Sequence, residues 1–210
     1  MLGECAASGR DRSSLLAVVE AVLRRGGTPV SQASLARDAG LANNTVAAGY
    51  LELLADLLFL GRSHAWDESR KIAVRRRPAK RPPVNLLAAV AFDRARLRSV
   101  DDFLALPDDE KGKWWEWLVA QEIWRRAARR GEPVPEDLLH WRTKEREIDF
   151  VVDPDLLVEV KRGEARALDY SWFPRSFPDA RLRIVTRTPF AAGRIRGWTM
   201  ADLLRDESWG

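Results

Sequence analysis

Four residues in the second half of the chain could carry out metal-dependent chemistry: Glu116, Asp149, Glu159 and Lys161. Hydrophobic and charged residues alternate over 147–152 and again over 157–161, which predicts two β-strands with one buried and one polar face. Asp149, Glu159 and Lys161 could then converge on one face. Two carboxylates beside an ammonium suit a Mg²⁺-dependent phosphodiesterase, because carboxylate oxygens bind hard cations and the ammonium can orient water or a phosphate.

The pairing of these two strands decides whether the carboxylates meet. Asp153-Pro154-Asp155 is a turn signal between them. A loop centred near Pro154 places Asp149 opposite Glu159, with Cβ atoms about 5 Å apart. A two-residue turn would instead pair Asp149 with Val160 and move Glu159 to the other face. The predicted site therefore requires an odd-numbered loop or a β-bulge.

The same alternation is typical of any hairpin with one solvated face, so the hairpin alone does not establish catalysis. The preceding segment, 112–130, has the apolar spacing of an amphipathic helix. Within it Glu122 has Arg125 and Arg126 at helical spacing, which predicts ordinary surface ion pairs. Glu116 has mainly apolar neighbours on its side of the helix. Because a carboxylate there is costly unless something binds it, Glu116 is the better functional candidate.

Four segments of this region, in order, resemble a known pattern. They are Gly-Lys-Trp-Trp-Glu-Trp-Leu-Val at 112–119, Trp-Arg-Thr at 141–143, Glu-Ile-Asp-Phe-Val at 147–151 and Val-Glu-Val-Lys at 158–161. A helix glutamate followed by an aspartate and Glu-x-Lys on adjacent strands resembles the PD-(D/E)XK nuclease fold of restriction endonucleases and archaeal Holliday-junction resolvases. More closely, roughly residues 84–206 resemble the C-terminal domain of unknown function that follows an AAA-type ATPase in many bacterial and archaeal proteins.

The resemblance implies an α/β (α+β) fold over 81–210, with a restriction-endonuclease-like mixed sheet and flanking helices. It implies that Glu116, Asp149 and Glu159 are ligands of Mg²⁺ or Mn²⁺ and that Lys161 lies near the attacked phosphate. Arg142 occupies a further characteristic position and is predicted to contact nucleic acid.

The sequence departs from that family in two respects. Pro82-Pro83-Val84-Asn85 stands where the family has Tyr-x-x-Asp. No Gly-x-x-x-x-Gly-Lys-Ser/Thr run occurs, so neither a nucleotide site nor ATP hydrolysis is expected. We therefore expect either a C-terminal part of an ATPase or a free-standing relative.

Residues 1–80 have the pattern of a winged helix-turn-helix. Helices are predicted over 14–25, over 31–39 and from the Asn43 cap to about Leu58, followed by an apolar strand at 57–61 and a wing over 62–74. The predicted core positions of the third helix are Val46, Tyr50, Leu53, Leu54 and Leu57. Its predicted outward positions are Asn44, Ala47, Ala48 and Glu52, which are poorly suited to reading base edges.

A basic run at 70–81 is the argument for DNA contact by this first part. The predicted nucleic-acid-binding residues within it are Arg75, Arg76, Arg77, Lys80 and Arg81. Such runs are also common in solvated linkers, and helix-turn-helix units also serve as docking modules. We expect weak, sequence-tolerant DNA contact or a structural role rather than operator recognition.

Composition is compatible with these interpretations. The 210 residues suffice for two small domains, and the net charge of +4 favours polyanionic partners. Cys5 is the one cysteine, and no apolar run reaches membrane-spanning length, so a cytoplasmic protein is expected. The nine tryptophans favour core packing, with a homodimer or protein partner as a further possibility. The alternative to a nuclease is a non-catalytic DNA- or protein-binding module that acts with a separate or detached ATPase.

Overall fold

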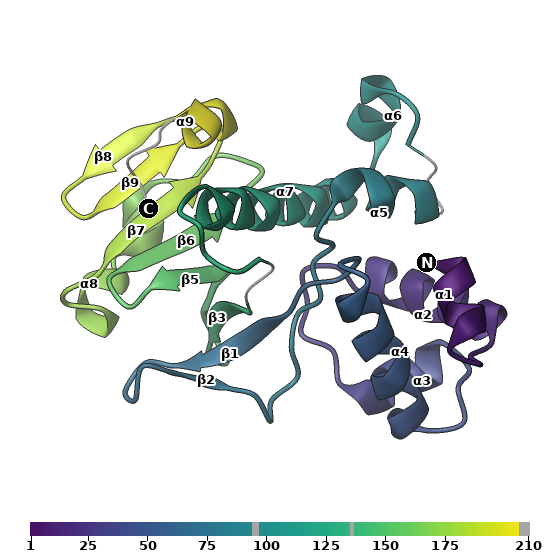
Figure 1. Cartoon of the computed structure of the whole chain (residues 1–210). Coiled ribbons are helices and arrows are strands. Elements are labelled where there is room, and N and C mark those ends of the chain that lie inside the picture. The colour runs from purple at the N-terminus through teal and green to yellow at the C-terminus, as the bar shows by residue number, and fades with distance from the viewer. Residues whose placement is uncertain (94–96, 135–136, 206–210) are drawn as a thin grey trace.

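The chain folds into a mixed α/β structure with two mixed sheets, seen in a computed structural model that describes residues 1–93, 97–134 and 137–205 (Figure 1). The helices are α1 (Leu2–Ala7), α2 (Arg12–Arg24), α3 (Gln32–Asp38), α4 (Asn44–Asp56), α5 (Leu86–Phe92), α6 (Val100–Ala105), α7 (Asp108–Arg129), α8 (Phe173–Ser176) and α9 (Met200–Arg205), with a 3₁₀ turn at Ala167–Tyr170. The strands are β1 (Ser63–Asp67), β2 (Ile72–Val74), β3 (Leu138–Arg142), β4 (Glu147–Ile148), β5 (Phe150–Asp153), β6 (Leu156–Val160), β7 (Arg181–Val185), β8 (Phe190–Ala192) and β9 (Ile195–Trp198).

Side-chain caps set the starts of the first three long helices. The side chains of Asp11, Ser31 and Asn43 each accept a backbone N–H from the first turn of α2, α3 and α4. The three predicted helices are therefore confirmed, with ends shifted by one or two residues. The predicted strand at 57–61 is wrong, since α4 ends in a turn and only Leu60 makes an isolated bridge, with Pro83.

The buried face of α4 is rotated from the predicted one. Ala47, predicted to point outward, is fully buried, whereas Val46, predicted in the core, is 38% exposed. The Tyr50 hydroxyl accepts the N–H of Asp11 and donates to its carbonyl, both at 3.1 Å. These two bonds hold Tyr50 against the start of α2, and Ala47 lies one turn away on the same side.

The first sheet has the order β2-β1-β3-β4 and joins the two halves of the sequence. β1 and β2 are antiparallel, as a wing would be, but β1 also runs parallel to β3. Beside them, Lys80 pairs with Ser63 and Ala79 with Val30. Backbone pairing therefore crosses the predicted boundary between 80 and 81.

The second sheet has the order β5-β6-β7-β9-β8. β6, β7 and β9 are parallel to one another, and β5 and β8 are antiparallel edge strands. Between β4 and β5 the chain leaves the first sheet and enters the second, and Asp149 is the residue at this crossing. The main candidate ligand thus lies where the two sheets meet.

Helix α7 runs across the middle of the molecule and connects the cores (Figure 1). Its N-terminal half packs Trp114 and Trp117 among the N-terminal helices, and its second half packs Trp124 against the second sheet. These three rings are buried and Trp115 is partly buried, which agrees with the core packing predicted for the tryptophans of this helix. Glu122, predicted to form surface ion pairs, is instead only 3% exposed.

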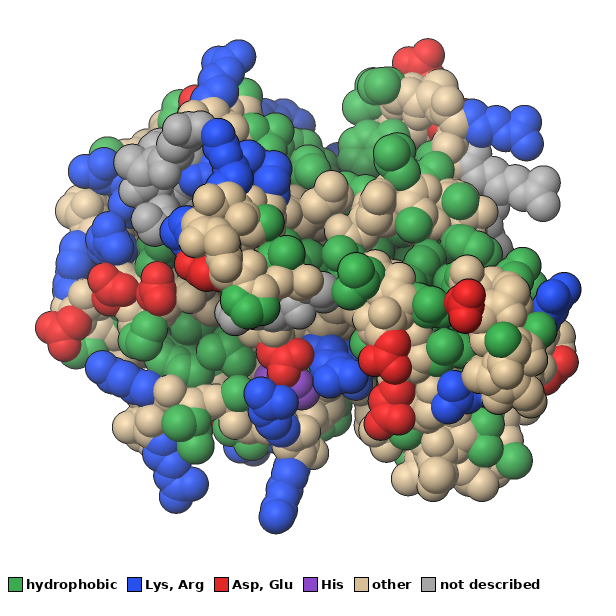
Figure 2. Space-filling model, in the orientation of Figure 1, with side chains coloured by type: hydrophobic (Ala, Val, Ile, Leu, Met, Phe, Trp, Pro, Cys, Tyr) green, Lys and Arg blue, Asp and Glu red, His purple; other side chains and the backbone are tan. Residues whose placement is uncertain are grey.

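The surface in Figure 2 is mixed in charge, with Lys and Arg side chains projecting around its edge rather than forming one continuous patch. Among the described helices, none combines the length and the apolar character needed to cross a bilayer.

Candidate active site

The register of the β5–β6 hairpin brings two carboxylates together. Phe150 lies opposite Val158, and the register shifts by one residue before Asp153. This shift is the irregularity that the sequence argument required. Continued by one residue, the ladder places Asp149 opposite Glu159, so of the two registers considered the structure has the one that the site hypothesis requires.

Asp149 is fixed to β6 by two hydrogen bonds. Its own N–H donates to Glu159 Oε2 at 3.3 Å, and the N–H of Val160 donates to Asp149 Oδ2 at 2.9 Å. The second bond holds the carboxylate by a backbone group that cannot rotate away. Both carboxylates are therefore positioned by the sheet rather than by flexible loops.

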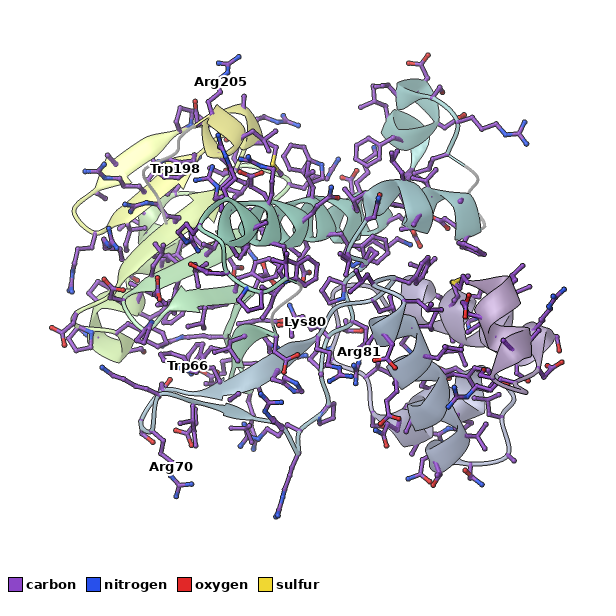
Figure 3. The ribbon with its side chains drawn as sticks, in the orientation of Figure 1. Trp66, Arg70, Lys80, Arg81, Trp198 and Arg205 are labelled. Atoms are coloured by element: carbon purple, nitrogen blue, oxygen red, sulfur yellow. The ribbon has the colours of Figure 1, made fainter. Side chains whose placement is uncertain are left out.

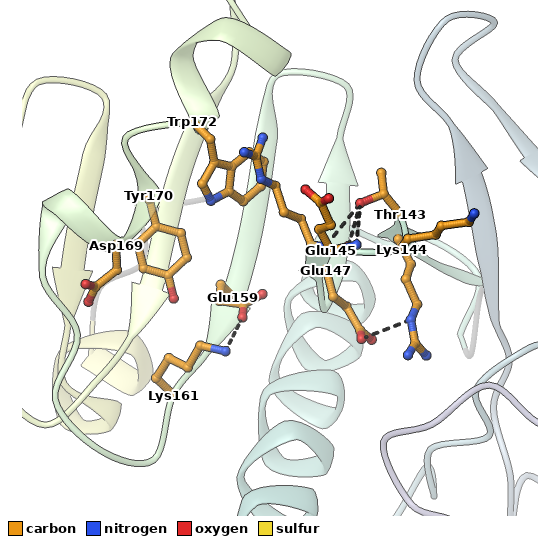
Figure 4. A pocket seen from close by; sticks show the side chains of 11 residues that line it. Thr143, Lys144, Glu145, Glu147, Glu159, Lys161, Asp169, Tyr170 and Trp172 are labelled. Atoms are coloured by element: carbon orange, nitrogen blue, oxygen red, sulfur yellow. Dashed lines mark hydrogen bonds and ion pairs between the residues drawn. The ribbon is translucent and has the colours of Figure 1, made fainter.

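Lys161 extends from the end of β6 toward solvent. Its ammonium lies 2.6 Å from Glu159 Oε1, and its side chain is 51% exposed while that of Glu159 is nearly buried (Figure 4). The Lys161 N–H donates to the Val185 carbonyl at 2.7 Å, which fixes its backbone to β7. The Glu159 carboxylate outweighs partial burial and raises the pKa of Lys161, so the side chain stays cationic.

Glu116 reaches the same place from α7. The loop after α2 packs directly over it, because a Cβ placed on Gly27 would lie 2.6 Å from Glu116 Oε2. Gly27 also has a φ of +78°, a conformation that other residues adopt at a cost. The N-terminal helical region thus forms one wall of the site.

Lys80 is the component that the sequence argument missed. It was predicted to bind nucleic acid as part of the basic run at 70–81, but it is only 2% exposed and lies in the interior between β1 and α7 (Figure 3). Its Nζ lies 2.9 Å from Glu116 Oε1, 2.8 Å from Glu147 Oε1 and 3.0 Å from Asp149 Oδ1. Its ammonium is therefore not available to a DNA backbone.

The backbone around Lys80 explains this position. Lys80 and Ser63 exchange both backbone hydrogen bonds, at 2.9 and 3.0 Å, and the Val30 N–H donates to the Ala79 carbonyl at 3.0 Å. These bonds hold the segment between β1 and the loop after α2. The Lys80 side chain consequently projects inward, where burial alone would lower its pKa but Asp149, Glu116 and Glu147 raise it well above the usual value.

The cluster contains more carboxyl groups than ammonium groups. Glu116, Glu147, Asp149 and Glu159 share the two ammonium groups of Lys80 and Lys161, and the Arg142 guanidinium reaches Glu147 only at 3.6 Å. Burial and the Asp149 carboxylate raise the pKa of both Glu116 and Glu159 to about 8, despite their lysine partners. Near neutral pH these two groups therefore hold protons for much of the time.

Two neighbouring pockets open onto the cluster. One, of about 300 Å³, is lined by Gly26, Gly27, Thr28, Gly112, Lys113, Glu116, Glu147, Asp149, Glu159, Val160 and Lys161. The other, of about 410 Å³, shares Glu147, Glu159 and Lys161 with it and continues past Arg142, Lys144, Arg146 and Trp172 (Figure 4). The Arg146 guanidinium lies 4.8 Å from the Trp172 ring centre. Lys80 lines neither pocket, so it supports the carboxylates from the protein interior.

The other predicted nucleic-acid contacts are dispersed. Arg75, Arg76 and Arg77 are exposed after β2, where Arg75 Nη1 lies 3.2 Å from Asp137 Oδ2. Arg81 is partly covered, and burial together with nearby Arg62 lowers its pKa. Arg142 stands at the rim of the larger pocket.

The donor set suits a divalent cation in chemistry and charge. Its oxygens are hard ligands, and when all four carboxyl groups are ionised they exceed the two ammonium groups by two negative charges. Within the described ranges, however, no group of three or more His, Cys, Asp or Glu side chains is already arranged to hold a metal. A cation at the pocket would therefore have to share carboxylates with Lys80.

Part of this site lies in a segment that matches a family model. Residues 111–185 match the model described as a domain of unknown function, DUF4143. That segment contains Glu116, Asp149, Glu159 and Lys161 but not Lys80. A search of curated proteins and a search of solved structures each found no match. The second half of the chain is therefore similar to a family whose description assigns no activity.

Proposed function

We propose that this protein is a DNA phosphodiesterase that depends on Mg²⁺ or Mn²⁺. The observation that carries the proposal is the meeting of Glu116, Asp149 and Glu159 at one pocket, with Lys161 at its mouth. These groups come from a helix and from adjoining strands, as in the nuclease fold that the sequence resembles. The proposal therefore includes a PD-(D/E)XK-like arrangement of the second half and a winged-helix character for the first.

The carboxylates of Glu116, Asp149 and Glu159 would hold the cation. When bound, a divalent cation acts as a Lewis acid toward a phosphoryl oxygen and balances the charge that develops during phosphodiester hydrolysis. The excess of negative charge and the raised pKa of Glu116 and Glu159 support this assignment, because a cation would relieve the same repulsion that the protons now relieve.

Lys161 would contact the substrate directly. Its ammonium is half exposed, and Glu159 holds it at the wall shared by the two pockets. From there it can donate a hydrogen bond to a non-bridging phosphate oxygen or to the attacking water. Arg142, Lys144 and Arg146 line the larger pocket and could bind the flanking phosphates.

The cellular setting forms a further part of the proposal. The order of the sequence segments supports an association with an AAA-type ATPase, supplied by another region or another chain. A single cysteine, buried Cys5, supports a cytoplasmic location.

Cleavage assays test the proposal. Supercoiled, branched and single-stranded DNA are each incubated with the protein and Mg²⁺, Mn²⁺ or EDTA, and the products are resolved on gels. We expect metal-dependent cleavage of at least one substrate, reduced about 100-fold or more in Asp149→Asn and in Lys161→Met. Glu145→Gln, which changes an exposed carboxylate of the larger pocket, is the matched control. Equal cleavage by the wild type and Asp149→Asn would refute the assignment of the site.

The position of Lys80 favours a second candidate. Its ammonium already binds three carboxylates, as expected if the cluster is a permanent structural network. The protein would then be a non-catalytic DNA- or protein-binding module that acts with an ATPase. Metal calorimetry distinguishes the two functions, because a module with a closed network takes up neither Mg²⁺ nor Mn²⁺.

A further inference from the structure

A buried lysine at the centre of three carboxylates is costly to assemble. Removing an ammonium from water costs several kcal/mol, which attraction to nearby carboxylates offsets only when the geometry is good. Here the contacts to Glu116, Glu147 and Asp149 lie between 2.8 and 3.0 Å, so the three hydrogens of the ammonium can each be donated.

The three partners come from separate parts of the chain. Glu116 belongs to α7, Glu147 to β4 of the first sheet, and Asp149 to the crossing between the sheets. Because they carry like charges, these carboxylates would separate without a cation between them. Lys80 joins all three and is itself fixed through its backbone to β1.

We infer that Lys80 is a positioning residue that acts as a built-in cation of this cluster and leaves it room for one divalent cation rather than two. The inference rests on the proposed function. In two-metal sites a pair of divalent cations about 3.5–4 Å apart shares the carboxylates. Here Lys80 occupies the interior side of the carboxylates, and the two pockets open on the other.

The count of charges supports a single divalent cation. Once Glu116 and Glu159 have lost their protons, four carboxylates less the charges of Lys80 and Lys161 leave an excess of two negative charges, which one divalent cation balances. A second would leave the pocket strongly positive before any substrate bound.

A double-mutant cycle tests the electrostatic role of Lys80 without metal. Lys80→Met keeps much of the side-chain volume and removes the charge, and we expect the Tm to fall by roughly 10 °C or more. Glu147→Gln removes one partner, and alone it should change the Tm little, because Glu147 is the most exposed of the three. The double variant should be more stable than Lys80→Met. If the double variant is no more stable than Lys80→Met, or if both variants are unfolded, the inference is overturned.

Mn²⁺ titration followed by calorimetry and by electron paramagnetic resonance tests the stoichiometry. We expect one Mn²⁺ per wild-type chain and about tenfold or tighter binding in Lys80→Met, because a positive neighbour has been removed. Lys71→Met removes the same charge from the exposed turn between β1 and β2, outside both pockets, and should change the affinity less than threefold. Two Mn²⁺ per wild-type chain, or weaker binding in Lys80→Met, contradicts the inference. If neither protein binds Mn²⁺, the metal-dependent function fails and the stability cycle alone decides the role of Lys80.

Discussion

Two glutamates of helix α7, Glu116 and Glu122, lie six residues apart in opposite electrostatic situations. Glu122 accepts bonds from Arg125 Nε and Nη2, both at 2.6 Å, and from Arg126 Nε at 2.7 Å. Burial raises its pKa, but the two arginines outweigh burial and hold the pKa below the usual value. Glu116 instead shares Lys80 with other carboxylates, and its pKa rises to about 8.

The comparison separates a structural ion pair from a site in which the negative charges are not balanced by nearby cations. Glu122 is surrounded by more cations than it needs, and Arg126 is fixed further by the carbonyl of Leu203 at 2.5 Å. Glu116 is surrounded by more anions than its one cation can balance. Burial of a carboxylate therefore indicates function only when the nearby charges do not cancel.

The largest expected effect is on stability. Glu122→Gln should lower the free energy of unfolding by about 3 kcal/mol, because it removes the buried carboxylate that pairs with Arg126. Glu116→Gln should cost less than about 1 kcal/mol or stabilise the fold, since it removes one excess negative charge. Urea unfolding at pH 7.5 measures both values. If Glu116→Gln costs as much as Glu122→Gln, the distinction between the two sites is lost.

For DNA cleavage we expect the opposite order, with the larger loss in the Glu116 variant. Glu116→Gln should reduce metal-dependent cleavage about 100-fold or more. Glu122→Gln, assayed at a temperature at which it is folded, should stay within about threefold of wild type. Initial rates at saturating Mn²⁺ provide the measurement. Circular dichroism confirms that each variant is folded at the assay temperature.

A substitution at Gly27, which packs against Glu116, should have a smaller effect. Gly27→Ala introduces a Cβ 2.6 Å from Glu116 Oε2 at a positive φ, so it should cost about 2 kcal/mol and displace the carboxylate. Gly40 has a φ of +66° but nothing within 4 Å of an added Cβ. Gly40→Ala therefore reports the backbone strain alone, about 1 kcal/mol, without loss of cleavage. Equal costs for the two changes would mean that the contact with Glu116 relaxes freely.

Local patterns were sufficient to predict the two strands of the hairpin half of the site, because alternation and turn signals act between residues close in sequence. They left two registers open, and the β-bulge before Asp153 selects the one that places Asp149 opposite Glu159. The apolar spacing over 112–130 predicted helix α7 in the same way. The burial of Glu122 did not follow, since its cover comes partly from α9, whose Leu203 carbonyl binds the neighbouring Arg126.

Long-range pairing could not be predicted from these patterns. Lys80 is 36 residues from Glu116 and 69 from Asp149, and no local periodicity connects them. The parallel pairing of β1 with β3 brings Lys80 next to the cluster. It joins strands that are also far apart in the sequence, so local patterns could not predict it. A signal was nevertheless present, because prolines at 78, 82 and 83 interrupt the basic run around Lys80 and favour extended backbone there.

The pH dependence of stability provides the smallest test. The pKa of Glu116 rises from 4.5 to about 8 on folding, so between these values the folded state binds more protons than the unfolded state. This contribution to stability is complete below pH 4.5 and is lost as the pH rises through about 8. The free energy of unfolding of the metal-free wild type should therefore fall by on the order of 1–2 kcal/mol between pH 5 and pH 8, and that of Glu116→Gln should fall clearly less.

Glu122→Gln is the control. Glu122 has a lowered pKa and its contribution to stability has the opposite sign, so Glu122→Gln should keep the decline. Parallel pH profiles for wild type and Glu116→Gln would mean that Lys80 fully compensates Glu116, and the charge imbalance would then lie elsewhere in the cluster.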